Sequence, residues 1–293
     1  RHKVVLVEAG EEFIYYTEEK TIDGKRCLFL LRYGVISREE TVLYVETLGE
    51  GETYVRADML EGMIQLVTWE QSRGLWVTRV DRESGKTLLT RELMAVGKLE
   101  AAVPVAGNCL LAFYGKSEEE EELFEEYRQW GGRKLSFLFS IDSGERQLVQ
   151  DKRVSQLSAS DIHSYRDGGG EEILLLCEAH VAEDVKRYLY NEKRSVWLGK
   201  EEVRDSIWKI PAAQLVKEVF QKLRVLSLDM VCSASVDGYV RYIGMGNGAF
   251  YYRSNFFPAD IEKVFSCRME DGQTEVCAEL DLGHLEKGVS YCF

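Results

Sequence analysis

The stretch "VDRESGKTLLTRE", residues 80–92, joins two strand-like segments through a tight turn. An alternating segment runs into Asp81 and a Ser-Gly pair, and a second apolar segment follows. The same order returns in "LSFLFSIDSGERQLVQD", residues 135–151, where Asp142 stands 61 residues after Asp81. A glycine in such a turn supplies the positive φ that a tight hairpin requires. Two hairpins of this kind in one context predict a structural repeat, and we expect both aspartates to shape turns rather than to catalyse.

Paired apolar segments recur along the whole chain. They lie at residues 27–34 with 41–48, at 63–69, at 108–115, at 172–181 and at 239–248. Their spacing indicates a repeat of roughly 40–60 residues with about four short strands in each unit. A four-stranded sheet cannot bury both of its faces alone, so sheets of this size stack around an axis as blades.

The turn resembles the Asp-x-x-Ser/Thr-Gly-Lys hairpin of quinoprotein-like and WD40-like β-propellers. Asp81, Ser84, Gly85 and Lys86 match this pattern, and the turn at Asp142 matches a shortened form. The resemblance implies an all-β fold. We expect a single β-propeller over residues 1–293 with six blades, five to seven being allowed, and with short helical insertions.

The resemblance does not extend to a cofactor. The tryptophan expected after the turn is missing, since Leu89 and Thr90 stand near its place, and the chain has no vicinal cysteine pair. We therefore expect no quinone and no other cofactor. Because the sequence begins with Arg1 rather than Met, we expect it to be an excised part of a larger protein. We also expect the ends, residues 4–10 and 288–293, to pair as strands and close the ring.

Composition narrows the class of partner. The formal net charge of −13 argues against nucleic acid, because binding a phosphate backbone needs clustered Lys and Arg. No segment approaches the about 20 apolar residues of a membrane span. Seven cysteines lack a CxxC pair or zinc-ligand spacing, so we expect mostly buried thiols and no metal site. Thiols of this kind favour a cytoplasmic location; an extracytoplasmic domain of an anchored protein is the alternative.

Two insertions interrupt the β pattern, and a third segment is ambiguous. Residues 117–134 are rich in helix formers, and residues 178–195 can carry a short helix. In residues 211–226, Pro211 can open a helix with Leu215, Val219, Phe220 and Leu223 turned inward. An edge strand is the alternative there, and the periodicity favours the helix.

The segment "SASDIHSYRDGGGEE", residues 158–172, has the densest mixture of site-like side chains. Loops that lead into inner strands line the axial mouth of a propeller, where ligands bind. We therefore expect a ligand-binding site made by Asp161, His163, Tyr165 and Arg166, with no catalytic residue and no metal. A polar crossing between blades with a glycine hairpin is the alternative.

These observations favour a non-catalytic ligand- or protein-binding propeller module, a sensor or scaffold. The acidic surface is expected to attract a basic protein or a small cationic ligand. One alternative is a propeller hydrolase that acts on glycans through carboxylates at the mouth, which requires two acids about 5–10 Å apart. The acids that could do this are Asp161, Asp167, Glu171 and Glu172. Another alternative is a structural subunit of an assembly.

Overall fold

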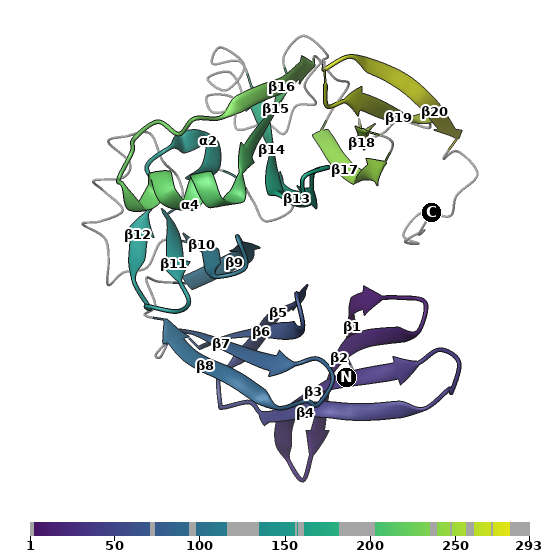
Figure 1. Ribbon diagram of the computed structural model, residues 1–293, viewed down its shortest axis with the longest axis vertical. Helices are drawn as coiled ribbons and strands as arrows, with labels where there is room; N and C mark the ends of the chain where they lie inside the picture. The colour runs from purple at the N-terminus through teal and green to yellow at the C-terminus, as the bar shows by residue number, and fades with distance from the viewer. Residues whose placement is uncertain are drawn as a thin grey trace, which may run out of the picture. The chain divides into compact units, whose positions relative to one another are not determined.

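The computed structural model describes residues 3–70, 74–93, 98–115, 135–155, 157, 161–181, 203–234, 239–246, 248–255, 261–270 and 272–281. Within these ranges the chain forms five antiparallel sheets of four strands each (Figure 1). The chain divides into two compact units, residues 1–156 with 218–224 and residues 157–217 with 225–293. Each unit is described by itself.

The first unit holds three sheets. Sheet 1 has β1 (Lys3–Ala9), β2 (Phe13–Ile22), β3 (Lys25–Gly34) and β4 (Glu40–Thr47). Sheet 2 has β5 (Thr53–Leu60), β6 (Met63–Glu70), β7 (Gly74–Asp81) and β8 (Thr87–Leu93). Sheet 3 has β9 (Lys98–Val105), β10 (Cys109–Gly115), β11 (Leu135–Ser140) and β12 (Arg146–Leu148). The short helix α2 (Lys152–Ser155) follows β12 in the sequence.

The second unit holds two sheets. Sheet 4 has β13 (Ile162–Arg166), β14 (Glu172–Val181), β15 (Val203–Pro211) and β16 (Asp229–Ala234), with helix α4 (Ala212–Phe220) after β15. Sheet 5 has β17 (Tyr239–Gly246), β18 (Ala249–Asn255), β19 (Ile261–Arg268) and β20 (Thr274–Asp281). In all five sheets the strands lie in chain order. The predicted units of four strands are confirmed, and the number of six remains a prediction.

The cores lie between consecutive sheets. Ile64 and Leu66 of β6 pack with Leu30 of sheet 1, whereas Val67 of the same strand packs with Phe137 of sheet 3. This division follows from the alternation of side chains along a strand. In the second unit, sheets 4 and 5 share a core of Leu175, Ile207, Phe250, Tyr252 and Cys267.

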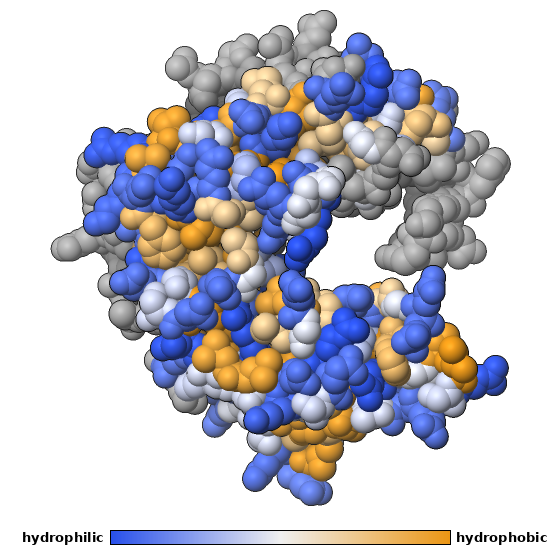
Figure 2. Space-filling view, viewed as in Figure 1, coloured by the Kyte–Doolittle hydropathy of each residue, from blue (hydrophilic) through white to orange (hydrophobic). Residues whose placement is uncertain are grey.

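The fourth strands β4 and β8 are less buried than the second and third strands of their sheets. Val42 and Val45 of β4 and Leu88 of β8 are all exposed. On the visible face of the first unit, hydrophobic and hydrophilic residues are interspersed (Figure 2). Sheet 2 therefore buries both faces through its inner strands while its last strand stays near solvent.

The turn of the stretch 80–92 recurs between the third and fourth strands of four of the five sheets. In the copy at Asp81, the Asp81 N–H donates to the Lys86 carbonyl at 2.8 Å, and the Gly85 N–H donates to the Asp81 carbonyl at 2.9 Å. The same two bonds join the corresponding residues of the turns that begin at Gly34, Ser140 and Arg268. The fifth residue of each turn is left-handed: Arg38 (φ 58°), Gly85 (φ 72°), Gly144 (φ 77°) and Gly272 (φ 67°). The predicted repeat is real and has more copies than the sequence revealed.

The alignment of the two sequence copies is wrong by two positions. Ser140, not Asp142, takes the place of Asp81, because Ser140 makes the two backbone bonds of the first turn residue. Its Oγ also accepts the Ser143 N–H at 3.3 Å, as the Asp81 Oδ1 accepts the Ser84 N–H at 2.8 Å. Asp142 is the third residue of its turn. The turn-forming role expected for Asp81 is confirmed, and in the second copy Ser140 has it instead.

The predicted helix after Pro211 is present as α4. Leu215 and Val219 are buried as expected, but Leu223 lies beyond the end of the helix and is 40% exposed. The first residues of the second predicted insertion, Glu178–Val181, are the end of strand β14. The rest of that segment, the insertion at 117–134 and the C-terminal segment 288–293 lie outside the described residues. Cys27, Cys109 and Cys267 are buried, whereas Cys277 is exposed.

Candidate functional site

The first strands of sheets 1, 2 and 3 lie beside one another. β5 contacts both β1 and β9 (Figure 1), and each of the three is the edge strand of its own sheet. Polar side chains on these strands can therefore act together, although they come from separate parts of the sequence.

A β-bulge at Val55 sorts the polar residues of β5 between two faces. The register shifts between Tyr54 and Arg56, so that Tyr54 lies opposite Thr68 while Arg56 lies opposite Val67. The extra residue turns Tyr54 toward sheet 1 and leaves Arg56 on the face that packs against sheet 3. Asp58, two residues further along, shares the face of Arg56.

Arg56 and Asp58 form an ion pair. The Arg56 Nε donates to the two carboxylate oxygens at 2.9 and 2.8 Å, and Nη2 contacts the same carboxylate. The Arg56 Nη1 donates to the Ala102 carbonyl of β9 at 2.8 Å. The pair therefore ties the first strand of sheet 2 to the first strand of sheet 3.

The Asp58 carboxyl is the group in this pair suited to proton transfer. Its side chain is 11% exposed, whereas that of Arg56 is 33% exposed. Burial raises the pKa of Asp58 above its ordinary value, and the neighbouring Arg56 offsets only part of this rise. Asp58 thus holds its proton at pH values where an exposed aspartate has lost it, which is a property of general acids.

A buried polar row continues from Asp58 across sheet 2. Gln65 of β6 lies opposite Asp58, and Arg79 of β7 lies opposite Gln65. The Arg79 Nε donates to the Gln65 Oε1 at 3.1 Å. Its Nη1 donates to the Asn108 Oδ1 at 3.1 Å, and its Nη2 donates to the Gly107 carbonyl at 2.5 Å. Burial lowers the pKa of Arg79, and these acceptors compensate its buried charge.

Tyr54 provides a second polar group on the sheet 1 side. Its hydroxyl accepts a hydrogen bond from the Thr17 Oγ1 at 3.0 Å. Lys3 of β1 lies over the Tyr54 ring, 5.7 Å from its centroid, and 4.0 Å from a Glu19 carboxylate oxygen. Burial raises the pKa of Tyr54, so its hydroxyl stays protonated.

The residues expected to bind a ligand lie on and before β13, the first strand of sheet 4. His163 and Tyr165 share one face of this strand, and Arg166 lies on the other face, exposed to solvent. Asp161 immediately precedes the strand. Tyr165 packs against the core shared by sheets 4 and 5, and burial raises its pKa. The strand brings His163 and Tyr165 together and separates both from Arg166.

The glycine-rich loop after β13 is shaped by Asp167. Its Oδ1 accepts the N–H groups of Gly169 and Glu171, both at 2.9 Å. Among the four acids considered for a hydrolytic site, Asp167 is therefore engaged in holding a turn.

Arg56 and Asp58 were not among the residues expected from the sequence. Their signal is the segment "TYVRADML", residues 53–60, in which two opposite charges stand two residues apart in an otherwise apolar strand. Among the described residues, no group of three or more His, Cys, Asp or Glu side chains is placed to hold a metal ion. In the same part of the chain, no helix is long and apolar enough to cross a membrane.

No protein-family model matches the chain, and no curated protein matches it. Solved structures with similar folds include an oligogalacturonate lyase in complex with manganese, at 12% identity and a TM-score of 0.51 over 92% of this chain and 62% of that one. The acylaminoacyl peptidase of Pyrococcus horikoshii matches at 8% identity and a TM-score of 0.50, over 94% and 39% of the two chains. The β-propeller domain of the trilobed protease from Pyrococcus furiosus matches at 10% identity and a TM-score of 0.48, over 93% and 70%.

The fold is that of an all-β propeller, as the resemblance of the turns implied. The chain spans less than two thirds of the lyase and of the peptidase. Both of these proteins are enzymes, and this finding overturns the prediction of a non-catalytic ligand- or protein-binding module. That prediction rested on the lack of a catalytic motif in the sequence. A propeller assembles its polar groups from separate strands, so a sequence motif need not exist.

Proposed function

We propose that this chain is the propeller of an enzyme that cleaves glycans, as a hydrolase or a lyase, with Asp58 as its acid–base group. The observation that carries the proposal is the Asp58 carboxyl itself. It lies on an edge strand, it is mostly buried, its pKa is raised, and it contacts the partly exposed guanidinium of Arg56. The oligogalacturonate lyase among the similar folds supports a glycan as the substrate class.

Cleavage of a glycosidic bond needs a proton for the departing oxygen, whether the bond is hydrolysed or broken by elimination. A carboxyl group with a raised pKa keeps that proton to a higher pH than an exposed aspartate does. Once the proton has left, the Arg56 guanidinium stabilises the resulting carboxylate through charge-assisted hydrogen bonds. Arg56 is also exposed enough to donate to an oxygen of a sugar.

The proposal is tested by incubating the protein with a panel of neutral and uronate-containing oligosaccharides. New reducing ends without new ultraviolet absorbance indicate hydrolysis, and absorbance from a new carbon–carbon double bond indicates elimination. Asp58→Asn should lower the rate by about 100-fold or more. Arg56→Lys should lower it less, because Lys keeps the charge but loses the two-point contact.

Asp23→Asn is the matched control, because Asp23 is an exposed turn residue of the same unit. Its rate should equal that of the unchanged protein. Cleavage that survives Asp58→Asn in full would refute the role of Asp58. Cleavage of peptides but of no glycan would show that the substrate class is wrong.

We also propose that residues 1–293 form one propeller domain with six blades. Trp76 lies in the first compact unit and Trp208 in the second. Variants that retain one of these as the sole tryptophan should unfold at the same urea concentration, because a single domain unfolds cooperatively. Two separate transitions would indicate two domains.

A further inference from the structure

Gln65 carries a fully buried amide in which, among the described residues, only the oxygen has a hydrogen-bond partner. Its side chain is 0% exposed, and its Oε1 accepts the Arg79 Nε–H at 3.1 Å. Its Nε2 has no hydrogen-bond partner in the part of the chain that the structure describes. Buried amide donors in proteins are almost always paired with protein or with ordered water, because an unmade bond costs stability.

Gln65 and Asp58 are neighbours across the pairing of two strands. Gln65 and Asp58 are directly opposite in the pairing of β5 with β6, so their side chains share one face of sheet 2. Opposed residues have Cβ atoms about 4.5–5.5 Å apart. A water molecule that bridges two polar groups satisfies a buried donor that makes no direct bond to protein.

The charged and polar groups near Asp58 are engaged with other partners, so none of them pairs with the Gln65 Nε2. Arg56 on the same strand already contacts both carboxylate oxygens. Arg79 is directed to Gln65, Asn108 and Gly107. From sheet 3, the Ala102 carbonyl is an acceptor and is engaged by Arg56. Tyr54 lies on the opposite face of β5 because of the bulge at Val55.

We propose that Gln65 holds one buried water molecule against Asp58 and thereby acts as a positioning residue for the acid–base group. The Gln65 Nε2–H donates to the water oxygen, and the water donates one hydrogen to the ionised carboxylate. The bridge stabilises Asp58 after it has given up its proton, and it fixes the orientation of the carboxyl. The role of this bridge in catalysis rests on the proposed function, whereas the presence of the bridge does not depend on it.

The first test uses the unchanged protein. Cross-relaxation measured by NMR between the Gln65 side-chain amide protons and water should reveal a water molecule with a long residence time. A crystal structure should show this water between the two side chains. A direct bond from the Gln65 Nε2 to another protein atom, with no water there, would overturn the proposal.

The second test measures the pKa of Asp58 from its carboxyl carbon resonance. Gln65→Met removes the donor and should raise the pKa of Asp58 by about one pH unit. Thr68→Val is the control, because Thr68 is a buried residue of the same strand that faces sheet 1 and donates to Glu52 at 2.6 Å. Thr68→Val should lower stability and leave the pKa of Asp58 unchanged. An unchanged pKa of Asp58 in Gln65→Met would contradict the proposal.

Neither test needs enzyme activity, so the two proposals can fail separately. A bound water and a shifted pKa in a protein that cleaves no glycan would keep the bridge and remove the proposed function. If glycans are cleaved, the acidic or basic limb of the rate profile should shift in Gln65→Met by the same amount as the pKa of Asp58. A purely structural role for Gln65 would lower the rate at all pH values alike.

Discussion

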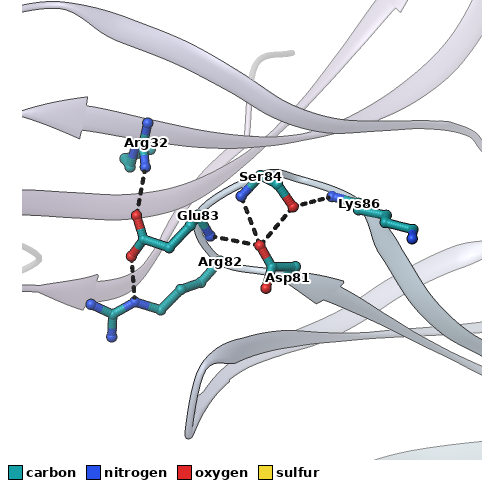
Figure 3. A network of polar contacts seen from close by, with 6 residues as sticks. All are labelled: Arg32, Asp81, Arg82, Glu83, Ser84 and Lys86. Carbon is teal, nitrogen blue, oxygen red and sulfur yellow. Dashed lines mark hydrogen bonds and ion pairs between the residues drawn. The ribbon is translucent and has the colours of Figure 1, made fainter.

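Arg79 Nη1 lies 3.9 Å from a carboxylate oxygen of Asp142, across the boundary between sheets 2 and 3. The equivalent pair one sheet earlier is Arg32 with Glu83, at 3.4 Å (Figure 3). Each arginine stands two residues before the first residue of its own turn, and each acid is the third residue of the next sheet's turn. The repeated turn therefore also connects one sheet to the sheet before it.

The two arginines should differ in their effect on stability. Arg79 is buried and donates to three further acceptors that would lose their partner. We expect Arg79→Met to lower the free energy of unfolding by about 2–3 kcal/mol. Arg32→Met should cost about 0–1 kcal/mol, because Glu83 is mostly exposed. Urea denaturation measures both, and equal losses would contradict this assignment.

A side chain at Gly85 should destabilise the fold more than one at Gly144. Its φ is 72°, and a Cβ added there would lie 2.2 Å from the Leu43 carbonyl oxygen of β4. Gly144 has the equivalent place in its turn, with a φ of 77° and nothing within 4 Å of an added Cβ. Gly144→Ala should cost about 1 kcal/mol for the left-handed backbone alone. Gly85→Ala should cost about 3 kcal/mol, since the backbones must also separate.

This comparison is read from thermal or urea unfolding of both variants. It isolates the contact with Leu43, because the two glycines have the same turn geometry. A loss of stability in Gly85→Ala no greater than that in Gly144→Ala would show that the turn does not pack tightly against sheet 1.

Asp81 should stabilise the fold in a pH-dependent manner. Its carboxylate accepts the Ser84 hydroxyl at 2.6 Å and backbone N–H groups of the turn (Figure 3). The Ser84 hydroxyl and backbone lower the pKa of Asp81. A lowered pKa in the folded state gives a contribution that is present above the ordinary pKa of aspartate and is lost as the pH falls through the folded-state value.

Asp81→Ala should therefore have a lower Tm than the unchanged protein at pH 7, and the two values should converge under acidic conditions. Calorimetry over a pH series provides the measurement. A difference in Tm that stays constant down to strongly acidic pH would mean that the carboxylate is not the stabilising group.

Tyr165 should contribute mainly to the stability of the fold. It packs against the core of Leu175, Ile207, Phe250, Tyr252 and Cys267. Tyr165→Ala should lower the free energy of unfolding by about 2 kcal/mol, whereas Tyr165→Phe should cost less because it keeps the packing. Arg166→Ala on the exposed face should leave stability nearly unchanged. If Tyr165→Phe abolishes binding of a ligand at full stability, the ligand site expected at β13 gains direct support.

The sequence determined the strands and turns that depend on interactions between residues close together in the chain. Apolar alternation marked the strands, and the Ser-Gly pairs at Gly85 and Gly144 marked two turns because left-handed backbone favours glycine. The other two copies escaped because the sequence signal is weak there. Arg38 takes the left-handed position of one turn, and Gly34 and Arg268 replace the capping Asp or Ser. The register error at Asp142 has the same origin, since Ser140 can accept the turn's N–H as Asp81 does.

Only the tertiary structure decided the candidate site. Asp58 is an ordinary strand residue in the sequence, and its pKa is raised because sheet 3 covers one face of β5. That face carries Arg56 and Asp58, but not Tyr54, because a single bulge at Val55 changes the pairing with β6. Burial is set by a sheet far away in the chain, and the register by a bulge in the hairpin of β5 and β6; no sequence pattern records either. The sequence by itself therefore determined the repeat and the fold, whereas the pairing of β5 with β6 placed the acid, the arginine and the glutamine on one face, and packing against sheet 3 covered that face.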